Sequence, residues 1–208
     1  SKRGSFRVGL VFFKADLSKR LCPTFRILGV SDKDKDDLKN LMDDLAYSNA
    51  QNIIAFKALL NEHSQQNDIE AISPKGDSRK KYDLPKPINL EDLSTDEKEL
   101  FEEIRSIGGT VSVGFPPMWL RGLARYPSKM PLVWAILTQL EAAGQLADMK
   151  EVIREASDHY SSILSAYVER TPRPDTASEA IERLGKLCDA IPRAIPVCLA
   201  LRKAVTSA

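Results

Sequence analysis

Apolar residues recur at helical spacing along most of this 208-residue chain, and this periodicity constrains the fold more than any other feature. The first strong example is the stretch 32–47, where Ser31 or Asp32 is suited to be the N-cap and acids fill the first turn, at the positive end of a helix dipole. One side of the stretch is apolar, with Leu38, Leu41, Met42 and Leu45. This pattern predicts a helix over 32–47.

A second helix is predicted directly after the first, with Ser48 as its cap. Its apolar face begins with two asparagines and continues with larger side chains, namely Asn49, Asn52, Ile53, Phe56 and Leu60. Near the C-terminus the same layout recurs, because a helix after a capping box at Thr176 and Glu179 meets the prolines of "IPRAIPVCLALRKAV" before a last apolar helix. We therefore expect residues 31–60 and 174–202 to be two copies of a helix-break-helix unit.

Three further helices are predicted between these units. Ser94 and Glu97 form a capping box for the first, which Gly108 and Gly109 end, and the second spans 128–143. The third spans 149–168 with a wide inward face, made of Met149, Val152, Ile153, Ala156, Tyr160, Ile163, Leu164 and Tyr167. Beyond the first dozen residues there is no convincing β alternation, so the fold class is all-α.

Domain organisation follows from these units and from the polar stretch between them. "SPKGDSRKKYDLPKP" combines prolines, a glycine and a basic cluster, which is typical of a connection. We expect a helical domain of two degenerate repeats with an incomplete first repeat: a remnant of that repeat over 1–72, a linker over 73–92 and the second repeat over 93–208.

Composition excludes several classes of function. Thirty basic against 29 acidic residues leave a net charge of +1, so no nucleic-acid partner is expected. No apolar run is long enough to span a membrane, and the short apolar patch near the N-terminus is below signal-peptide length. Three cysteines without C-x-x-C spacing and two histidines predict no disulfide framework, no metal site and a cytoplasmic protein.

Three stretches resemble the group I 2-haloacid dehalogenases, an all-α family of two repeats. They are "RILGVSDKDKDDLKNLMDDLAYSNAQNIIAFKALL", "AISPKG" and "RGLARYPSKMPLVW", and the resemblance extends over most of residues 20–205. In that family a buried aspartate activates water for direct attack on the halogen-bearing carbon, and an asparagine helps to hold the water. The resemblance therefore implies a small 2-substituted carboxylic acid as substrate and no cofactor.

The site residues of the dehalogenase family match this sequence only in part. Asn49 matches the asparagine and is the predicted catalytic residue, whereas Asn52 stands where the family has a tyrosine. Aligning "LARYP" places Trp119 at the position of the aspartate, and there is no Asp or Glu between Glu103 and Glu141, so the base is unassigned. The predicted substrate-binding residues are Asn52, Phe115, Met118, Trp119 and Arg121.

Each of these residues also has a simpler interpretation. Trp119 and its apolar neighbours can be ordinary core, and Arg121 can be solvated. Three functions stay open: a dehalogenase-like hydrolase that works with Asn49, a non-catalytic helical module that binds a small anion or a protein partner, and a cysteine-based reductase, which the cysteine spacing disfavours. A homodimer is compatible with the first two.

Overall fold

The computed structural model describes residues 31–61, 88–109, 114–166, 168 and 178–206. These residues form six α-helices and two short 3-10 helices, and no strand occurs among them, which confirms the all-α prediction. None of the described helices has a stretch long and apolar enough to cross a membrane. The expected boundaries at 72 and 73 lie outside the described residues, and the division into repeats stays a prediction.

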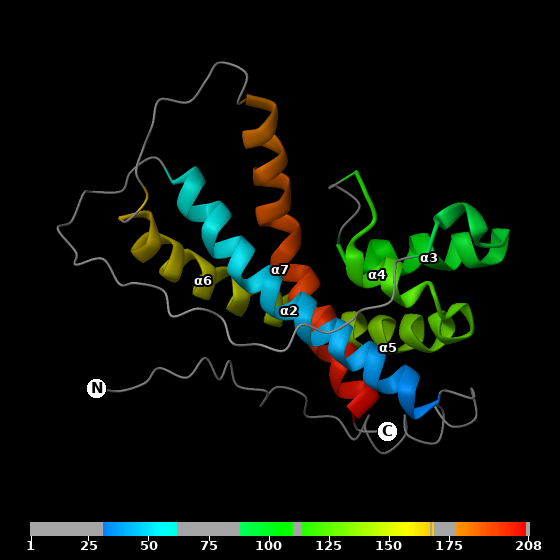
Figure 1. Ribbon diagram of the computed structural model, residues 1–208. Helices are drawn as coiled ribbons and strands as arrows, with labels where there is room; N and C mark the ends of the chain where they lie inside the picture. The colour runs from blue at the N-terminus through cyan, green and yellow to red at the C-terminus, as the bar shows by residue number, and fades with distance from the viewer. Residues whose placement is uncertain (1–30, 62–87, 110–113, 167, 169–177, 207–208) are drawn as a thin grey trace.

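Two long helices, α2 (Asp32–Leu60) and α7 (Ser178–Thr206), pack against each other at the centre of the fold. Figure 1 shows them crossing with opposite chain directions. Arg202 pairs with Asp43 near one end of the crossing, and Ile53 packs against Ile191 and Ile195 towards the other. The helix α6 (Gln145–Ser165) lies beside this pair.

The predicted break at Ser48 is wrong, because α2 is one continuous helix of 29 residues. Ser48 does not cap a second helix; its Oγ donates a 3.3 Å hydrogen bond to the carbonyl oxygen of Leu45, one turn earlier. A serine hydroxyl can bond to the preceding turn in this way without interrupting a helix. The predicted N-cap is confirmed at Ser31, which forms a capping box with Asp34.

The predicted break at the C-terminal prolines is also wrong. Pro192 and Pro196 lie inside α7, which continues through them to Thr206. Each proline lacks the N–H that would bond to the carbonyl four residues earlier, a loss of about 3 kcal/mol in an isolated helix. Both prolines are buried, so packing of the central part of α7 holds the helix together where propensity alone would end it. Thr176 lies outside the described residues.

The remaining helices pack against the other half of the α2–α7 pair. They are η2 (Leu90–Asp92), α3 (Thr95–Ile107), α4 (Met118–Leu123), η4 (Pro127–Lys129) and α5 (Met130–Ala142). The capping box of Ser94 and Glu97 and the helix end at Gly108 are confirmed. Arg193 of α7 donates to the carbonyl oxygen of Ile107 at 3.0 and 3.1 Å and thus ties α7 to the end of α3.

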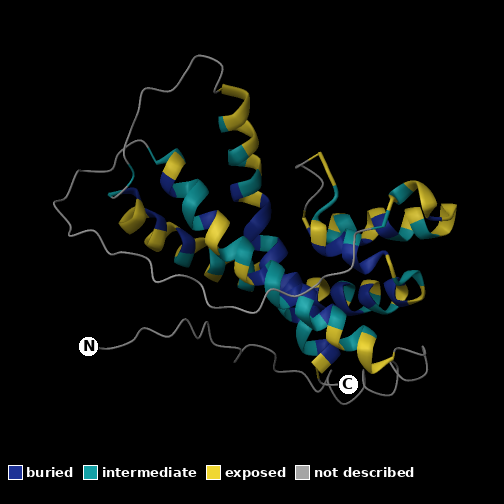
Figure 2. Ribbon diagram, viewed as in Figure 1, coloured by how far each residue is buried: buried dark blue, intermediate teal, exposed yellow. Residues whose placement is uncertain are grey.

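The core concentrates on this side of the molecule. Figure 2 shows buried positions where α2 and α7 cross and along α4 and α5, whereas the far ends of α6 and α7 carry many exposed residues. Trp119 is the largest fully buried side chain and belongs to this core. A smaller cluster around Ile53 holds α2, α6 and α7 together.

Candidate functional site

The two predicted asparagines lie on α2, near its middle. Asn49 is half-buried, and Asn52 is exposed. The Asn49 side chain forms no hydrogen bond with any residue that the structure describes, so no carboxylate is held beside its amide there. The catalytic role of Asn49 stays a prediction.

The other predicted site residues separate into a core residue and surface residues. Trp119 is 1% exposed, whereas Met118 is 48% and Phe115 is 56% exposed, and Arg121 is half-buried. Their exposure therefore ranges from the core to the open surface. The described part of the chain encloses a cavity of about 10 Å³, room for one water, whose lining contains no predicted site residue: Leu38, Met42, Leu123, Lys129, Val133, Leu201, Ala204 and Val205.

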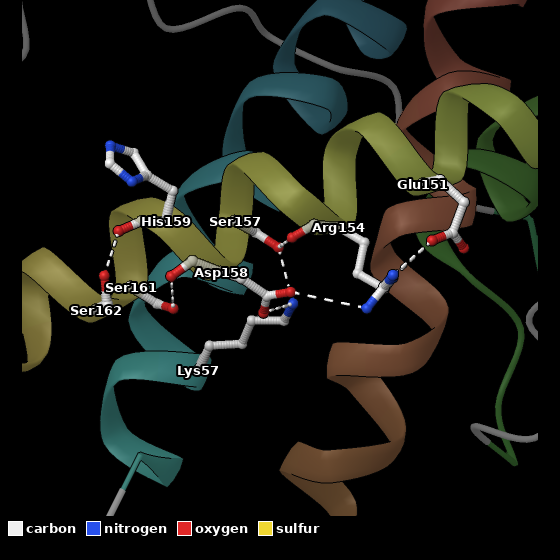
Figure 3. A network of polar contacts seen from close by, with 8 residues as sticks. All are labelled: Lys57, Glu151, Arg154, Ser157, Asp158, His159, Ser161 and Ser162. Carbon is white, nitrogen blue, oxygen red and sulfur yellow. Dashed lines mark hydrogen bonds and ion pairs between the residues drawn. The ribbon is translucent and has the colours of Figure 1, made fainter. Parts of the chain in front are cut away.

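A polar network joins α2 to α6 and was not expected from the sequence (Figure 3). Lys57 of α2 donates to Ser157 Oγ at 2.9 Å and to Asp158 Oδ1 at 2.6 Å. Ser157 in turn donates to the carbonyl oxygen of Arg154 at 2.8 Å. The Lys57 side chain is only 16% exposed, so it is held in place where it crosses between the two helices.

The direction of the hydrogen bonds decides what this network can do. A lysine that activates a serine must be neutral and must accept the hydroxyl proton. Here Lys57 donates to Ser157, the Ser157 proton is directed to a backbone carbonyl, and the carboxylate of Asp158 stabilises the charged ammonium. The arrangement is therefore that of a structural link between α2 and α6.

We expect Lys57→Met to lower the free energy of unfolding by about 1 kcal/mol, because the lost ion pair is partly solvated at Asp158. Urea denaturation of Lys57→Met, Asp158→Asn and the double variant would give the coupling energy between the two residues. Leu59→Met, an exposed change on the same helix, is the control. A coupling energy of zero would contradict the structural link.

The two cysteines in the described part of the chain, Cys188 and Cys198, are buried. Burial raises the pKa of Cys198 to about 12, and burial also raises the pKa of Cys188. Both thiols are therefore protonated at neutral pH, and only the thiolate is strongly nucleophilic. Cys22 lies outside the described residues. Within the described part of the chain, no group of three or more His, Cys, Asp or Glu side chains could hold a metal ion.

The helix α6 is oriented differently from the prediction, because its buried face is largely made of serines. Ser157, Ser161 and Ser165 are 2–5% exposed. Their hydroxyls donate to carbonyl oxygens three residues earlier, at 2.8, 3.1 and 2.9 Å respectively. These bonds remove the penalty of burying a free hydroxyl, and the small side chains allow close helix packing.

Four of the large apolar residues predicted to face inward on α6 are instead exposed to a considerable extent, whereas Ile153 packs against the smaller core cluster as predicted. We call them the apolar face of α6, made of Val152 (44% exposed), Tyr160 (39%), Ile163 (46%) and Leu164 (38%). Tyr167, predicted for the same face, lies outside the described residues. A cluster of exposed apolar side chains on one helix is typical of a contact surface. This face is the strongest candidate functional site in the described residues.

Comparison with known proteins does not assign the chain to a family. No known protein family, curated protein or solved structure matches the chain. The resemblance to the group I 2-haloacid dehalogenases therefore stays a prediction from the sequence.

Proposed function

We propose that the chain is a non-catalytic helical module that binds a protein partner through the apolar face of α6. The observation that carries the proposal is the orientation of this helix, which buries serines and leaves Val152, Tyr160 and Ile163 exposed. Exposed apolar side chains release water when a partner covers them, which is the main driving force of protein association. Aromatic and aliphatic anchors such as Tyr160 and Ile163 suit this role.

Two further observations support a binding role over the hydrolase suggested by the dehalogenase resemblance. Trp119, at the position of the family's aspartate, is part of the hydrophobic core. The half-buried Asn49 has no described carboxylate within hydrogen-bond reach. A direct water attack needs a base placed within that reach of the water.

The test compares the wild type with Val152→Lys/Ile163→Lys, which places two charges on the apolar face. Immobilised proteins are exposed to an extract of the source cells, and any polypeptide retained by the wild type is identified, purified and titrated by calorimetry. We expect saturable binding that the variant loses and that Ala147→Lys retains, since Ala147 is an exposed α6 residue outside the face. Identical binding by wild type and variant would refute the proposal.

The same preparations can test the hydrolase directly. Halide release is measured with a panel of haloacids including 2-chloropropionate, at high protein concentration. We expect no release above the rate without protein. Release that Asn49→Ala abolishes would overturn the binding module and establish the dehalogenase-like function.

A further inference from the structure

The burial of α7 changes along its length, and the change falls close to its two prolines. None of the residues 178–187 is buried, whereas none of the residues 190–205 is exposed. We call residues 178–191 the α7 arm. In Figure 2 exposed positions run along the outer end of the arm, and buried positions follow where α7 crosses α2. Most of the arm therefore lies outside the core.

The arm joins the rest of α7 where the hydrogen bonding of the helix is interrupted. Pro192 and Pro196 have no N–H, so the carbonyl oxygens of Cys188 and Pro192 lose their bonds within the helix. Residues four apart lie on the same side of a helix, so two successive turns are weakened on one side. Prolines are a usual cause of a sharp bend in a helix. The bonding of α7 therefore favours a hinge at the base of the arm.

Directly after Pro192, α7 is fixed to the other half of the molecule. Arg193 donates to the carbonyl oxygen of Ile107 at 3.0 and 3.1 Å and pairs with Glu141. The Arg193 side chain also lies against Gly109, where an added Cβ atom would come 2.8 Å from Arg193 Cγ. A movement of the arm would therefore stop at Arg193, because the contacts to the ends of α3 and α5 begin there.

The base of the arm covers a small apolar cluster on α2 and α6. Ile191 packs with Ile53, which is 1% exposed, and Leu187 and Ile153 lie against the same cluster. Further out on the arm, Gly185 has open space beside it, so no neighbouring helix packs closely there. Among the described residues, the arm is thus held mainly by the apolar contacts near its base.

We propose that the α7 arm swings away from α2 and α6 about a hinge at Pro192 while the rest of the fold stays intact. Opening separates only the arm's contacts with the small cluster around Ile53, whereas the larger core stays packed. Segments held by few buried apolar contacts open at a lower free energy than the core of a protein. The open state uncovers Ile53 and Ile153, and thereby an apolar surface on α2 and α6 that the closed state hides.

Two native cysteines lie on either side of the hinge and report the opening separately. Cys188, in the arm, is 9% exposed, and Cys198, beyond both prolines, is 0% exposed. The full chain with Cys22→Ser is treated with N-ethylmaleimide at several urea concentrations below the unfolding transition, and mass spectrometry follows the labelling of each thiol. We expect Cys188 to react about 100-fold faster than Cys198, because only Cys188 becomes accessible without global unfolding.

Two substitutions decide which motion exposes Cys188. Ile136 of α5 belongs to the larger core, so Ile136→Val should speed the labelling of Cys198 several-fold and leave that of Cys188 unchanged. Leu187→Ala weakens the base of the arm and should speed the labelling of Cys188 several-fold. Equal acceleration of both thiols by Ile136→Val would mean that Cys188 reacts only through global unfolding. That result, or a Cys188 rate that Leu187→Ala leaves unchanged, would overturn the moving arm.

A third cysteine locates the hinge. Ala194 follows the anchor at Arg193 and is 5% exposed, so the thiol introduced by Ala194→Cys should react as slowly as Cys198. A rate like that of Cys188 would place the boundary of the moving segment beyond Arg193 and overturn the hinge at Pro192. The labelling needs no partner, so its outcome is independent of whether the apolar face of α6 binds a protein.

Discussion

Replacing Trp119 by alanine is expected to lower the free energy of unfolding by about 3–5 kcal/mol, the usual range for truncating a large buried aromatic side chain. The Trp119 side chain is 1% exposed and packs closely against the end of α3. A Cβ atom added at Gly108 would lie 2.7 Å from Trp119 Cζ2, so the ring occupies the space beside that glycine. Urea denaturation at neutral pH measures the loss directly.

Two control variants separate packing from ligand binding. Trp119→Phe should be much less destabilising than Trp119→Ala, because it keeps a ring in the core and because the Trp119 Nε1 donor has no hydrogen-bond partner to lose. Met118→Ala changes a neighbour on α4 that is 48% exposed, and should leave stability nearly unchanged. Equal stability of Trp119→Ala and Met118→Ala would contradict the core assignment of Trp119.

The features that sequence reasoning predicted correctly are local ones. The N-cap at Ser31 and the capping box of Ser94 with Glu97 depend on residues close together in the sequence, and both are present. The breaks at Ser48 and Pro192 were wrong because they depend on the surroundings of the helix. Whether a helix continues through a serine or a proline is decided by the neighbouring helices that pack on it, which no local pattern reveals.

The orientation of α6 was missed for a related reason. A hydrophobic pattern predicts that Val152 and Ile163 face inward. The same pattern places serines on the exposed side of a helix, because it considers only apolar residues as candidates for burial. The buried Ser157 and Ser161 satisfy their hydroxyls within the helix, and Lys57 adds a polar link from α2. The sequence did contain a signal for this orientation, because α6 has serines spaced four residues apart on one side and a row of apolar residues on another. They identify a helix with two different contact faces.

A buried ion pair gives the second large effect. Lys129 is 4% exposed, its Nζ lies 3.1 Å from Asp34 Oδ2, and it stands 3.9 Å from the centre of the Tyr126 ring. Asp34→Asn leaves the Lys129 charge without its carboxylate. We expect this variant to lower the free energy of unfolding by about 2–3 kcal/mol. This loss is at or just below the range that is usual when one partner of a buried ion pair is removed, because Asp34 is partly solvated. Lys129→Met should be milder, since a methionine suits the apolar side chains around it.

The same pair predicts how stability depends on pH. Burial alone would raise the pKa of Asp34, but hydrogen bonds from Lys129 and Ser31 and the charge of Lys129 together hold that pKa below its ordinary value of 3.8. A lowered pKa in the folded state means that the contribution is fully present above about pH 4 to 5 and is lost as the pH falls through the folded value. Urea denaturation at pH 6 and pH 3 should therefore show a larger loss of stability for the wild type than for Asp34→Asn/Lys129→Met. An equal loss in both proteins would show that Asp34 titrates alike in the folded and unfolded chain, and would contradict the ion pair.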